Sequence, residues 1–357
     1  MQVQLSAMLY IMSIKEEVCS FENLYKAMRH CQNNVMWKDS TAGFVKNGLS
    51  NCVDLHDELM SGKYKIGKYA VFTITEPKER SIVSTRIRDR TFQRSLCDHY
   101  LTKAISKSFI YDNCACQVGK GTDFARKRLK VHLQRFYRKY GQNGYVLKCD
   151  ISNYFGSTSH AVAEAAVKKR AHDKWAADEA VRIINSFTQG DDPAVGMGLG
   201  SQVTQLIELA VLDDIDHYIK EQLHIKHYIR YMDDFLLFHN DKRYLIYCKK
   251  IISDKLSALG LKLSAKKTQI HPISQPIHFL GFSFKLTGSG KALMFVLPKK
   301  VTHERRKLRK LVKLCGRQVL TREDVDKCYT AWMAHACKGN SYNLINSMTA
   351  YYNSLWR

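Results

Sequence analysis

The chain has 357 residues, of which 56 are Lys or Arg and 33 are Asp or Glu, so its formal net charge is +23. A hydrophobic fraction of 45% with only 5 prolines excludes a disordered chain. So large a positive charge implies an acidic partner, with nucleic acid the first candidate and an anionic membrane surface the second.

The predicted elements begin with helices and a pair of strands. Apolar residues recur at helical spacing over residues 14–62, residues 64–85 predict two strands joined by a turn, and residues 86–109 predict a further helix. Residues 122–140 predict a helix with a basic face, formed by Arg126, Lys127, Arg128, Lys130, Arg135, Arg138 and Lys139. Almost no acid interrupts this run after Asp123. We therefore interpret it as a face that contacts phosphates, although an ordinary solvated helix surface is the alternative.

The second half of the chain predicts a mixture of strands and helices. The patterns indicate, in chain order, a strand over 144–150, helical structure over 160–188, a loop over 190–200, a long helix over 201–223, a β-hairpin over 227–239, a helix over 244–259, a strand over 277–285, and a basic, mostly helical lobe over 299–315 and 322–356.

Neither a membrane segment nor a disulfide framework is expected. No apolar run approaches the ~20 residues that span a bilayer, and the first residues lack the basic region and cleavage site of a signal peptide. The start codon is either Met1 or Met12. The eleven cysteines show no paired or zinc-ligand spacing, which predicts reduced thiols in a cytoplasmic protein.

The acidic pair Asp233 and Asp234 lies between two apolar runs, residues 229–232 and 235–238. Apolar runs favour burial and paired like charges oppose it, a conflict that a divalent cation in a cleft would resolve. Asp150, which ends an apolar strand, supplies a third carboxylate. Three carboxylates at strand ends could hold two Mg²⁺ ions roughly 3.5–4 Å apart, as in phosphoryl or nucleotidyl transfer.

These residues resemble the motifs of bacterial retroelement-type reverse transcriptases. Six motifs in the expected order carry the resemblance: the fingers motifs, counted as one and formed by residues 76–80 and 88–90, motif A at 148–155, motif B at 198–205, the YxDD signature Tyr231-Met232-Asp233-Asp234, motif D at 263–268 and motif E at 279–282. The stretch from Tyr329 to Asn340 is similar to the thumb end of such enzymes.

The resemblance implies an α+β right-hand polymerase fold with fingers, a palm with an antiparallel sheet, and a helical thumb. We expect an N-terminal helical extension over 1–62, fingers and palm over 63–290, and a basic thumb over 291–357. It also implies an RNA-directed DNA polymerase. In that family's terms, Asp150 and Asp233 are the main metal ligands, Asp234 is the third carboxylate, and the backbone of Ile151 lies beside the triphosphate. The expected cofactor is a pair of Mg²⁺ ions, which Mn²⁺ can replace.

The same resemblance implies the substrate-binding residues. Lys78 and Arg80 would clamp phosphates, and Gly200 and Gln205 would shape the nucleotide and template pocket. Phe155 would exclude the ribose 2′-hydroxyl and so select dNTPs, or would simply be a palm core residue. Lys267 would stabilise or protonate the pyrophosphate, or would be a solvated lysine. The implied nucleic-acid contacts are Arg126, Lys127, Arg128, Lys130, Tyr231, Met232, Leu280, Gly281, Lys299, Lys300, Arg305 and Arg306.

The biological role stays divided between two branches. Motif B carries Leu199 and Gly198 where many retroviral-type enzymes have Gln and Pro, which favours bacterial elements. We expect a defence-associated enzyme that copies a dedicated noncoding RNA, with the mutagenic enzyme of a diversity-generating retroelement as the alternative. An inactive RNA-binding scaffold is a third reading, disfavoured because all three Asp residues are present. The expected partners are RNA template, DNA product, dNTPs and an accessory protein or a second copy of the chain. No RNase H or endonuclease module is expected.

Overall fold

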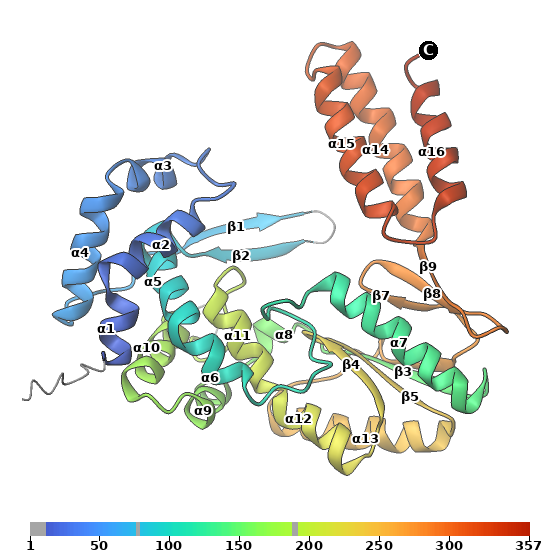
Figure 1. The fold of residues 1–357 in the computed structure, drawn as a ribbon, viewed down its shortest axis with the longest axis horizontal. Coiled ribbons are helices and arrows are strands. Elements are labelled where there is room, and N and C mark those ends of the chain that lie inside the picture. Colours follow the sequence, from blue (N-terminus) through green and yellow to red (C-terminus); the bar gives the residue numbers. More distant parts are fainter. Residues whose placement is uncertain (1–11, 76–78, 188–191) are drawn as a thin grey trace, which may run out of the picture. The chain divides into compact units, whose positions relative to one another are not determined.

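The computed structural model describes residues 12–75, 79–187 and 192–357 (Figure 1). It divides into two compact units, each assembled from three separate stretches of sequence. The first unit comprises Met1–Lys120, Asp150–His224 and Lys250–Ala265, and the second comprises Gly121–Cys149, Ile225–Lys249 and Lys266–Arg357. This division is based on compactness alone and does not test the expected boundaries of fingers, palm and thumb. Those boundaries stay predictions.

The first unit is mainly helical, with one antiparallel strand pair. Its elements are α1 (Ile14–Cys19), α2 (Phe21–Cys31), α3 (Asp39–Lys46), α4 (Gly48–Met60), β1 (Ala70–Ile74), β2 (Arg80–Ser84), α5 (Ile87–Leu96), the π-helix η1 (Cys97–Leu101), α6 (Thr102–Ser106), α8 (Tyr154–Ser157), α9 (His160–Arg170), α10 (Lys174–Asn185), α11 (Gln202–Val211), α12 (Asp213–His217) and the π-helix η2 (Tyr218–Gln222). Serine caps recur at its helix starts: the Ser13 side chain accepts from the Glu16 amide in a capping box, and Ser201 caps α11.

The second unit contains four helices and two sheets in which most strand pairs are antiparallel. Its elements are α7 (Thr122–Tyr140), β3 (Tyr145–Asp150, whose last residue is counted with the first unit), β4 (His227–Tyr231), β5 (Asp234–His239), β6 (Gln269–Pro272), β7 (Ile277–Phe279), β8 (Phe282–Leu286), β9 (Ala292–Val296), α14 (Pro298–Gly316), α15 (Arg322–Ala336) and α16 (Tyr342–Ser354). Helix α13 (Lys242–Ala258) begins in this unit and ends in the first. The strand orders are β4-β5-β3-β6 and β7-β8-β9.

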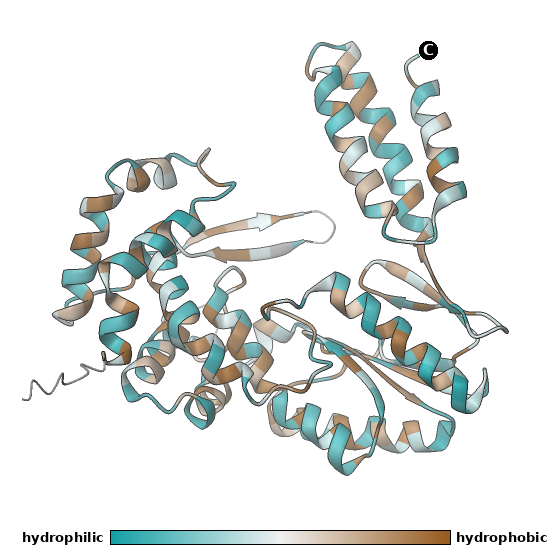
Figure 2. Cartoon of the chain, viewed as in Figure 1, coloured by the Kyte–Doolittle hydropathy of each residue, from teal (hydrophilic) through white to brown (hydrophobic). Residues whose placement is uncertain are grey.

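Burial in the second unit follows the hydrophobic pattern. Leu129, Leu133 and Phe136 of α7 are fully buried, and this helix packs on β4. Figure 2 shows the other face of α7, like much of α14, as hydrophilic. The last three helices have their own core of Leu308, Val325, Met348 and Tyr352.

The structure confirms the α+β class and most of the predicted elements. The hairpin over 227–239 and the helix over 122–140 are confirmed. The single strand over 277–285 is wrong, because a turn at Leu280 and Gly281 with φ of 45° and 83° folds it into the β7–β8 hairpin. The long helix over 201–223 is wrong as well, since the structure divides it into α11, α12 and η2. The mostly helical region expected over 322–356 contains two helices, α15 and α16, and the strands β6 and β9 were not predicted.

Within the described ranges, none of the helices is both long and apolar enough to cross a membrane.

Candidate active site

Motif A begins where strand β3 ends. Asp150 is the last residue of β3 and is 8% exposed, and its carbonyl accepts a 2.7 Å hydrogen bond from the Ser264 amide. The next residue, Ile151, is buried and forms an isolated antiparallel bridge with Leu263. The expected motif D segment therefore fixes the backbone on which the motif A carboxylate stands.

The YxDD signature forms the two-residue turn of the β4–β5 hairpin. Tyr231 pairs with Asp234, so Met232 and Asp233 are the turn residues. Met232 has a φ of 55°, a left-handed conformation that costs a residue other than glycine of order 1–3 kcal/mol. The buried Arg230 donates from Nη1 to the Met232 carbonyl at 3.1 Å. This contact stabilises the strained turn and so orients the two acids.

Asp234 lies beside a lysine from β3. Its Oδ2 is 3.5 Å from Lys148 Nζ, which also donates a 2.8 Å hydrogen bond to the His278 carbonyl. Both side chains of the ion pair are about one-fifth exposed, so solvent screens this interaction less than one at the open surface. Lys148 thus joins the acidic turn to the β7 strand.

A cavity of about 510 Å³ opens beside this lysine. Lys148 and Lys267 both line it, together with Gln269, His271, Gln275, Pro276 and His278. Burial lowers the pKa of His271, and the neighbouring His278 and Lys148 charges lower it further. The two lysines place two ammonium groups at the cavity, which suits it to an anion. The structure thus brings Lys267, expected at the pyrophosphate, into one pocket with Lys148, which the sequence interpretation did not name.

The three acids have the chemistry of a magnesium site, and the structure shows no preformed cluster. Carboxylate and backbone oxygens are the ligands that Mg²⁺ prefers, so Asp150, Asp233, Asp234 and the Ile151 carbonyl fit the ion by donor type. Asp150 ends β3 and Asp234 begins β5, and these strands are neighbours in one sheet. In residues 12–75, 79–187 and 192–357, no group of three or more His, Cys, Asp or Glu side chains is close enough to hold a metal.

The motif B loop packs tightly against the first unit's strand pair. Gly200 has a φ of 123°, and a Cβ there would lie 3.1 Å from the Val83 carbonyl of β2. A Cβ at Gly198 would lie 2.1 Å from the Phe187 ring, so this departure from the retroviral pattern has a packing reason. Thr204 caps the same turn by donating to the Gly198 carbonyl at 2.7 Å. Gln205 accepts from Cys116 at 3.5 Å.

Phe155 lies in α8 and is partly buried. Its carbonyl accepts a 2.6 Å hydrogen bond from the Met197 amide, and its ring meets Tyr154 edge-on at 5.8 Å. Tyr154, in turn, donates to the Glu208 carbonyl at 2.5 Å. Phe155 is thus less buried than Tyr154, which is 3% exposed.

The fingers residues are only partly described. Arg80 is the first residue of β2, where it pairs with Ile74. Lys78 lies outside the described residues.

The expected nucleic-acid contacts lie in several parts of the second unit. Lys300 lies against the β7–β8 turn, with its Nζ 2.6 Å from where a Cβ of Gly281 would be, so Leu280, Gly281 and Lys300 share one site. Tyr231 and Met232 lie at the acidic turn. Five further basic residues are exposed or partly exposed: Lys127, Arg128, Lys130, Lys299 and Arg306.

Arg126 and Arg305, by contrast, are engaged inside the protein. Arg126 is 7% exposed and lies over the Phe282 ring, and Arg305 donates to Ser347 and lies over Tyr351. Both have packing roles that the basic pattern alone did not indicate.

An acidic hairpin turn on an antiparallel sheet, preceded by a strand that ends in Asp, is typical of right-hand nucleic-acid polymerases. The chain belongs to the reverse transcriptase (RNA-dependent DNA polymerase) family, whose model matches residues 76–284, more than half of its length. The prediction of a reverse transcriptase and of its α+β right-hand fold is confirmed, and the bacterial retroelement branch stays a prediction.

Comparison with solved structures finds telomerases. One is apo telomerase from Candida tropicalis, with TM-score 0.48 and 12% identity, covering 68% of this chain and 52% of that one. Another is telomerase from Candida albicans in complex with a fragment of telomeric RNA, with TM-score 0.48 and 11% identity, covering 83% and 61%. The chain spans between about half and three-fifths of the length of these telomerases. A comparison with curated protein sequences found no match.

Proposed function

We propose that this chain copies RNA into DNA, extending a primer with dNTPs by two-metal nucleotidyl transfer. The observation that carries the proposal is the Asp233–Asp234 turn, held by Arg230 and placed beside Lys148, in a chain that matches the reverse transcriptase family. A strained turn with two acids at its tip is costly for a purely structural hairpin.

Each acid has an assigned role. Asp150 and Asp233 would hold the two Mg²⁺ ions, with Asp234 and the Ile151 carbonyl completing the set. When bound, the ions would neutralise the triphosphate and the attacking oxygen. Lys148 keeps Asp234 oriented, and the cavity that Lys148 shares with Lys267 would receive the departing pyrophosphate.

The other substrate contacts follow from the motif positions. Phe155 would exclude the 2′-hydroxyl of an rNTP, and Gly200 and Gln205 would shape the pocket for the incoming base. Lys78 and Arg80 would bind the triphosphate. Lys299, Lys300 and Arg306, with the basic residues of α7, would contact the phosphates of the template and product strands.

We place the chain in a bacterial retroelement or antiphage defence system, acting in the cytoplasm on a dedicated noncoding RNA, with an accessory protein or a second copy as a further partner. The motif B sequence supports a bacterial origin. The described cysteines form no disulfide, in keeping with a reducing compartment. The diversity-generating role stays the alternative, and sequencing the nucleic acid that copurifies with the protein separates the two. A structured RNA with complementary cDNA supports the defence role, and adenine-directed errors copied from a template repeat support the alternative.

The activity is tested by primer extension on an RNA template with dNTPs and Mg²⁺ or Mn²⁺. We expect Asp233→Asn to abolish extension, because it removes a metal-binding charge. Asp254→Asn, which removes an exposed carboxylate of α13, is the matched control and should extend like the parent. Extension by the Asp233→Asn variant at the parent rate would refute the metal assignment, and RNA binding without extension by the parent would favour the inactive scaffold.

A further inference from the structure

Phe155, the residue proposed to select the sugar, lies on a helix too short to be stable by itself. Helix α8 has four residues, and an isolated helix needs roughly 12–15 residues to be even marginally stable in water. Its N-cap, Asn153, has a φ of 45° and a ψ of 47°, a left-handed conformation that persists only where the surrounding structure imposes it. The position of Phe155 therefore depends on the segments that contact α8.

The segment that leads into motif B holds α8 from one side. The Met197 amide donates a 2.6 Å hydrogen bond to the Phe155 carbonyl, and the Gly196 amide donates one of 2.9 Å to the carbonyl of Thr158, the C-cap of the helix. These two contacts fasten the backbone of α8 on both sides of its last turn.

Helix α11 holds α8 from another side, through Glu208. The Tyr154 hydroxyl donates to the Glu208 carbonyl at 2.5 Å, and the Thr158 hydroxyl lies 3.0 Å from Glu208 Oε2. Thr158 Oγ1 is also 3.0 Å from the carbonyl of Tyr154. Both ends of α8 are thus tied to one residue of α11, and Phe155 lies between them. The Tyr154 ring continues the chain of contacts, since it meets the Phe155 ring edge-on.

The burial of this cluster favours a role in fixing geometry. Glu208 and Thr158 are fully buried, and the neighbours of Glu208 in α11, Ile207 and Leu209, are buried apolar residues. A buried carboxyl group costs free energy that an apolar side chain of similar size would not, unless hydrogen bonds offset it. What the carboxyl adds is a directional contact with the end of α8, and apolar packing alone would not supply that.

We propose that Thr158 and Glu208 are positioning residues for sugar selection, holding the Phe155 ring where it excludes the ribose 2′-hydroxyl, an inference that rests on the proposed function. A displacement of about 1 Å can change a rate by about 100-fold. A side chain that rejects one hydroxyl group therefore needs a fixed backbone as well as bulk.

The test measures kcat/KM for dNTP and for rNTP in primer extension and takes the ratio of the two. We expect Thr158→Val, which removes the hydroxyl and keeps the shape, to raise the relative use of rNTP by about 3- to 10-fold. Thr158→Ser keeps a hydroxyl and should stay near the parent ratio. Glu208→Leu should relax the ratio by a similar factor, whereas Glu208→Gln keeps a hydrogen-bonding group of the same size and should not.

Thr91→Val is the matched control. Thr91 is as buried as Thr158, and its hydroxyl donates to the Ile87 carbonyl within helix α5 at 2.8 Å. The variant should lower the midpoint of thermal unfolding and leave the sugar ratio unchanged. A change of the ratio in Thr91→Val equal to that in Thr158→Val would reduce the effect to general loss of stability and overturn the inference.

A double variant tests whether the effect passes through Phe155. Thr158→Val should change the ratio no further once Phe155→Val is in place, because the ring that it positions is gone. Two effects that simply multiply would overturn that route.

The remaining outcomes separate this inference from the proposed function. Unchanged ratios in Thr158→Val and Glu208→Leu, beside a relaxed ratio in Phe155→Val, would overturn the inference and leave RNA-directed synthesis standing. An unchanged ratio in Phe155→Val would overturn both the sugar-selecting role of Phe155 and the inference, with the Asp233 assignment intact. If Glu208→Leu does not fold, the contrast between Thr158→Val and Thr158→Ser decides the question.

Discussion

At the scale of single residues, Lys148 is the clearest addition to the motif set. It lies two positions before Asp150, and the period of two along a strand puts both side chains on one face of β3. The spacing was visible in the sequence, but nothing in it showed that the ammonium meets Asp234 on the neighbouring strand. Sequence motifs thus predict the metal-binding acids, and the structure adds a lysine that forms an ion pair with one of them.

We expect Lys148→Met to reduce primer extension by about 10- to 100-fold, because an unoriented Asp234 misplaces the reacting groups. Lys148→Arg should retain most of the activity, since a guanidinium can also reach a carboxylate. The measurement is kcat and KM for dNTP, with thermal unfolding as the check on folding. A loss confined to stability, equal for Met and Arg, would make Lys148 a structural residue only.

Phe155 tests the sugar selection. We expect Phe155→Val to raise incorporation of rNTP relative to dNTP by at least about 10-fold, because the smaller side chain leaves room for the 2′-hydroxyl. The ratio of kcat/KM values for the two substrates is the measurement. A fall in stability with an unchanged ratio would indicate that Phe155 is a core residue of the palm and does not select the sugar.

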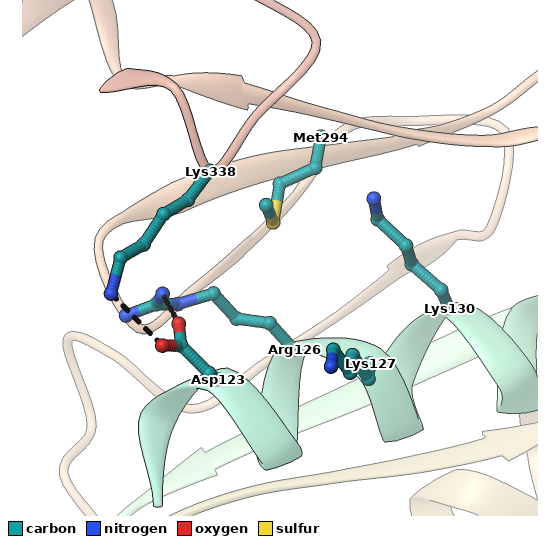
Figure 3. Close-up of a pocket in the computed structure, with 6 residues that line it drawn as sticks. All are labelled: Asp123, Arg126, Lys127, Lys130, Met294 and Lys338. Atoms are coloured by element: carbon teal, nitrogen blue, oxygen red, sulfur yellow. Dashed lines mark hydrogen bonds and ion pairs between the residues drawn. The ribbon is translucent and has the colours of Figure 1, made fainter. Parts of the chain in front are cut away.

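At the scale of elements, turns explain most differences between the predicted and the observed fold. The acidic hairpin was predictable because two polar residues interrupt apolar runs. The β7–β8 turn was missed because Leu280 is apolar, although the alternating apolar positions shift from 277 and 279 before the turn to 282 and 284 after it, a change of phase that a single strand would not show. Lys338 and Met294 are 44 residues apart along the chain, and no local pattern could have joined them into one pocket with the start of α7 (Figure 3).

The motif B loop gives a prediction about packing. We expect Gly198→Ala to destabilise the protein by about 1–3 kcal/mol, because the added methyl group meets the Phe187 ring in a packed interior. Gly43→Ala is the control: nothing lies within 4 Å of its Cβ position and it is in helix α3, where alanine is the better helix former. Chemical denaturation measures both. A Gly198→Ala protein as stable as the parent would show that the Phe187 ring moves aside without cost.

His335, in the last turn of helix α15, gives a prediction about how the stability of the protein depends on pH. Burial and the positive charges of Lys300, Arg126 and Lys338 lower the pKa of His335, against a smaller opposing effect of Asp123. Because the folded pKa is lower than the unfolded value of about 6.5, the unfolded chain binds the proton more readily, and stability falls as pH drops below about 6.5. We expect His335→Gln to lose less stability than the parent between about pH 7 and pH 5.

Denaturant midpoints over this pH range provide the measurement. The comparison with the variant is needed because His271 also has a lowered pKa and contributes in the same direction. Parallel pH profiles for the parent and His335→Gln would contradict the assignment.

At the scale of the whole molecule, the net charge of +23 is divided among distinct surfaces. Asp150, Asp233 and Asp234 are the acids of the proposed metal site, and the basic residues of α7 and α14 offer positive surface on the second unit. A molecule of this charge should bind nucleic acid mainly through phosphates.

We expect affinity for an RNA–DNA hybrid to fall by about 10³-fold or more between ~50 mM and ~200 mM salt, as for proteins with 6–10 phosphate contacts. Fluorescence anisotropy over that range measures it. An affinity that barely changes with salt would mean that the basic faces do not contact the strands.

The interleaving of the two units has a consequence for how the protein is made. Each unit takes three separated stretches of sequence, the first ending at Ala265 and the second running on to Arg357. During translation, the sheet that carries the acidic turn lacks β6 until residues 269–272 have emerged. Helix α7 likewise cannot make its contacts with β8 and β9 until those later strands have been synthesised. Pairings so distant in sequence form slowly and leave apolar strand edges exposed meanwhile. A nascent chain of this kind would depend on chaperones more than a protein whose domains follow one another along the sequence.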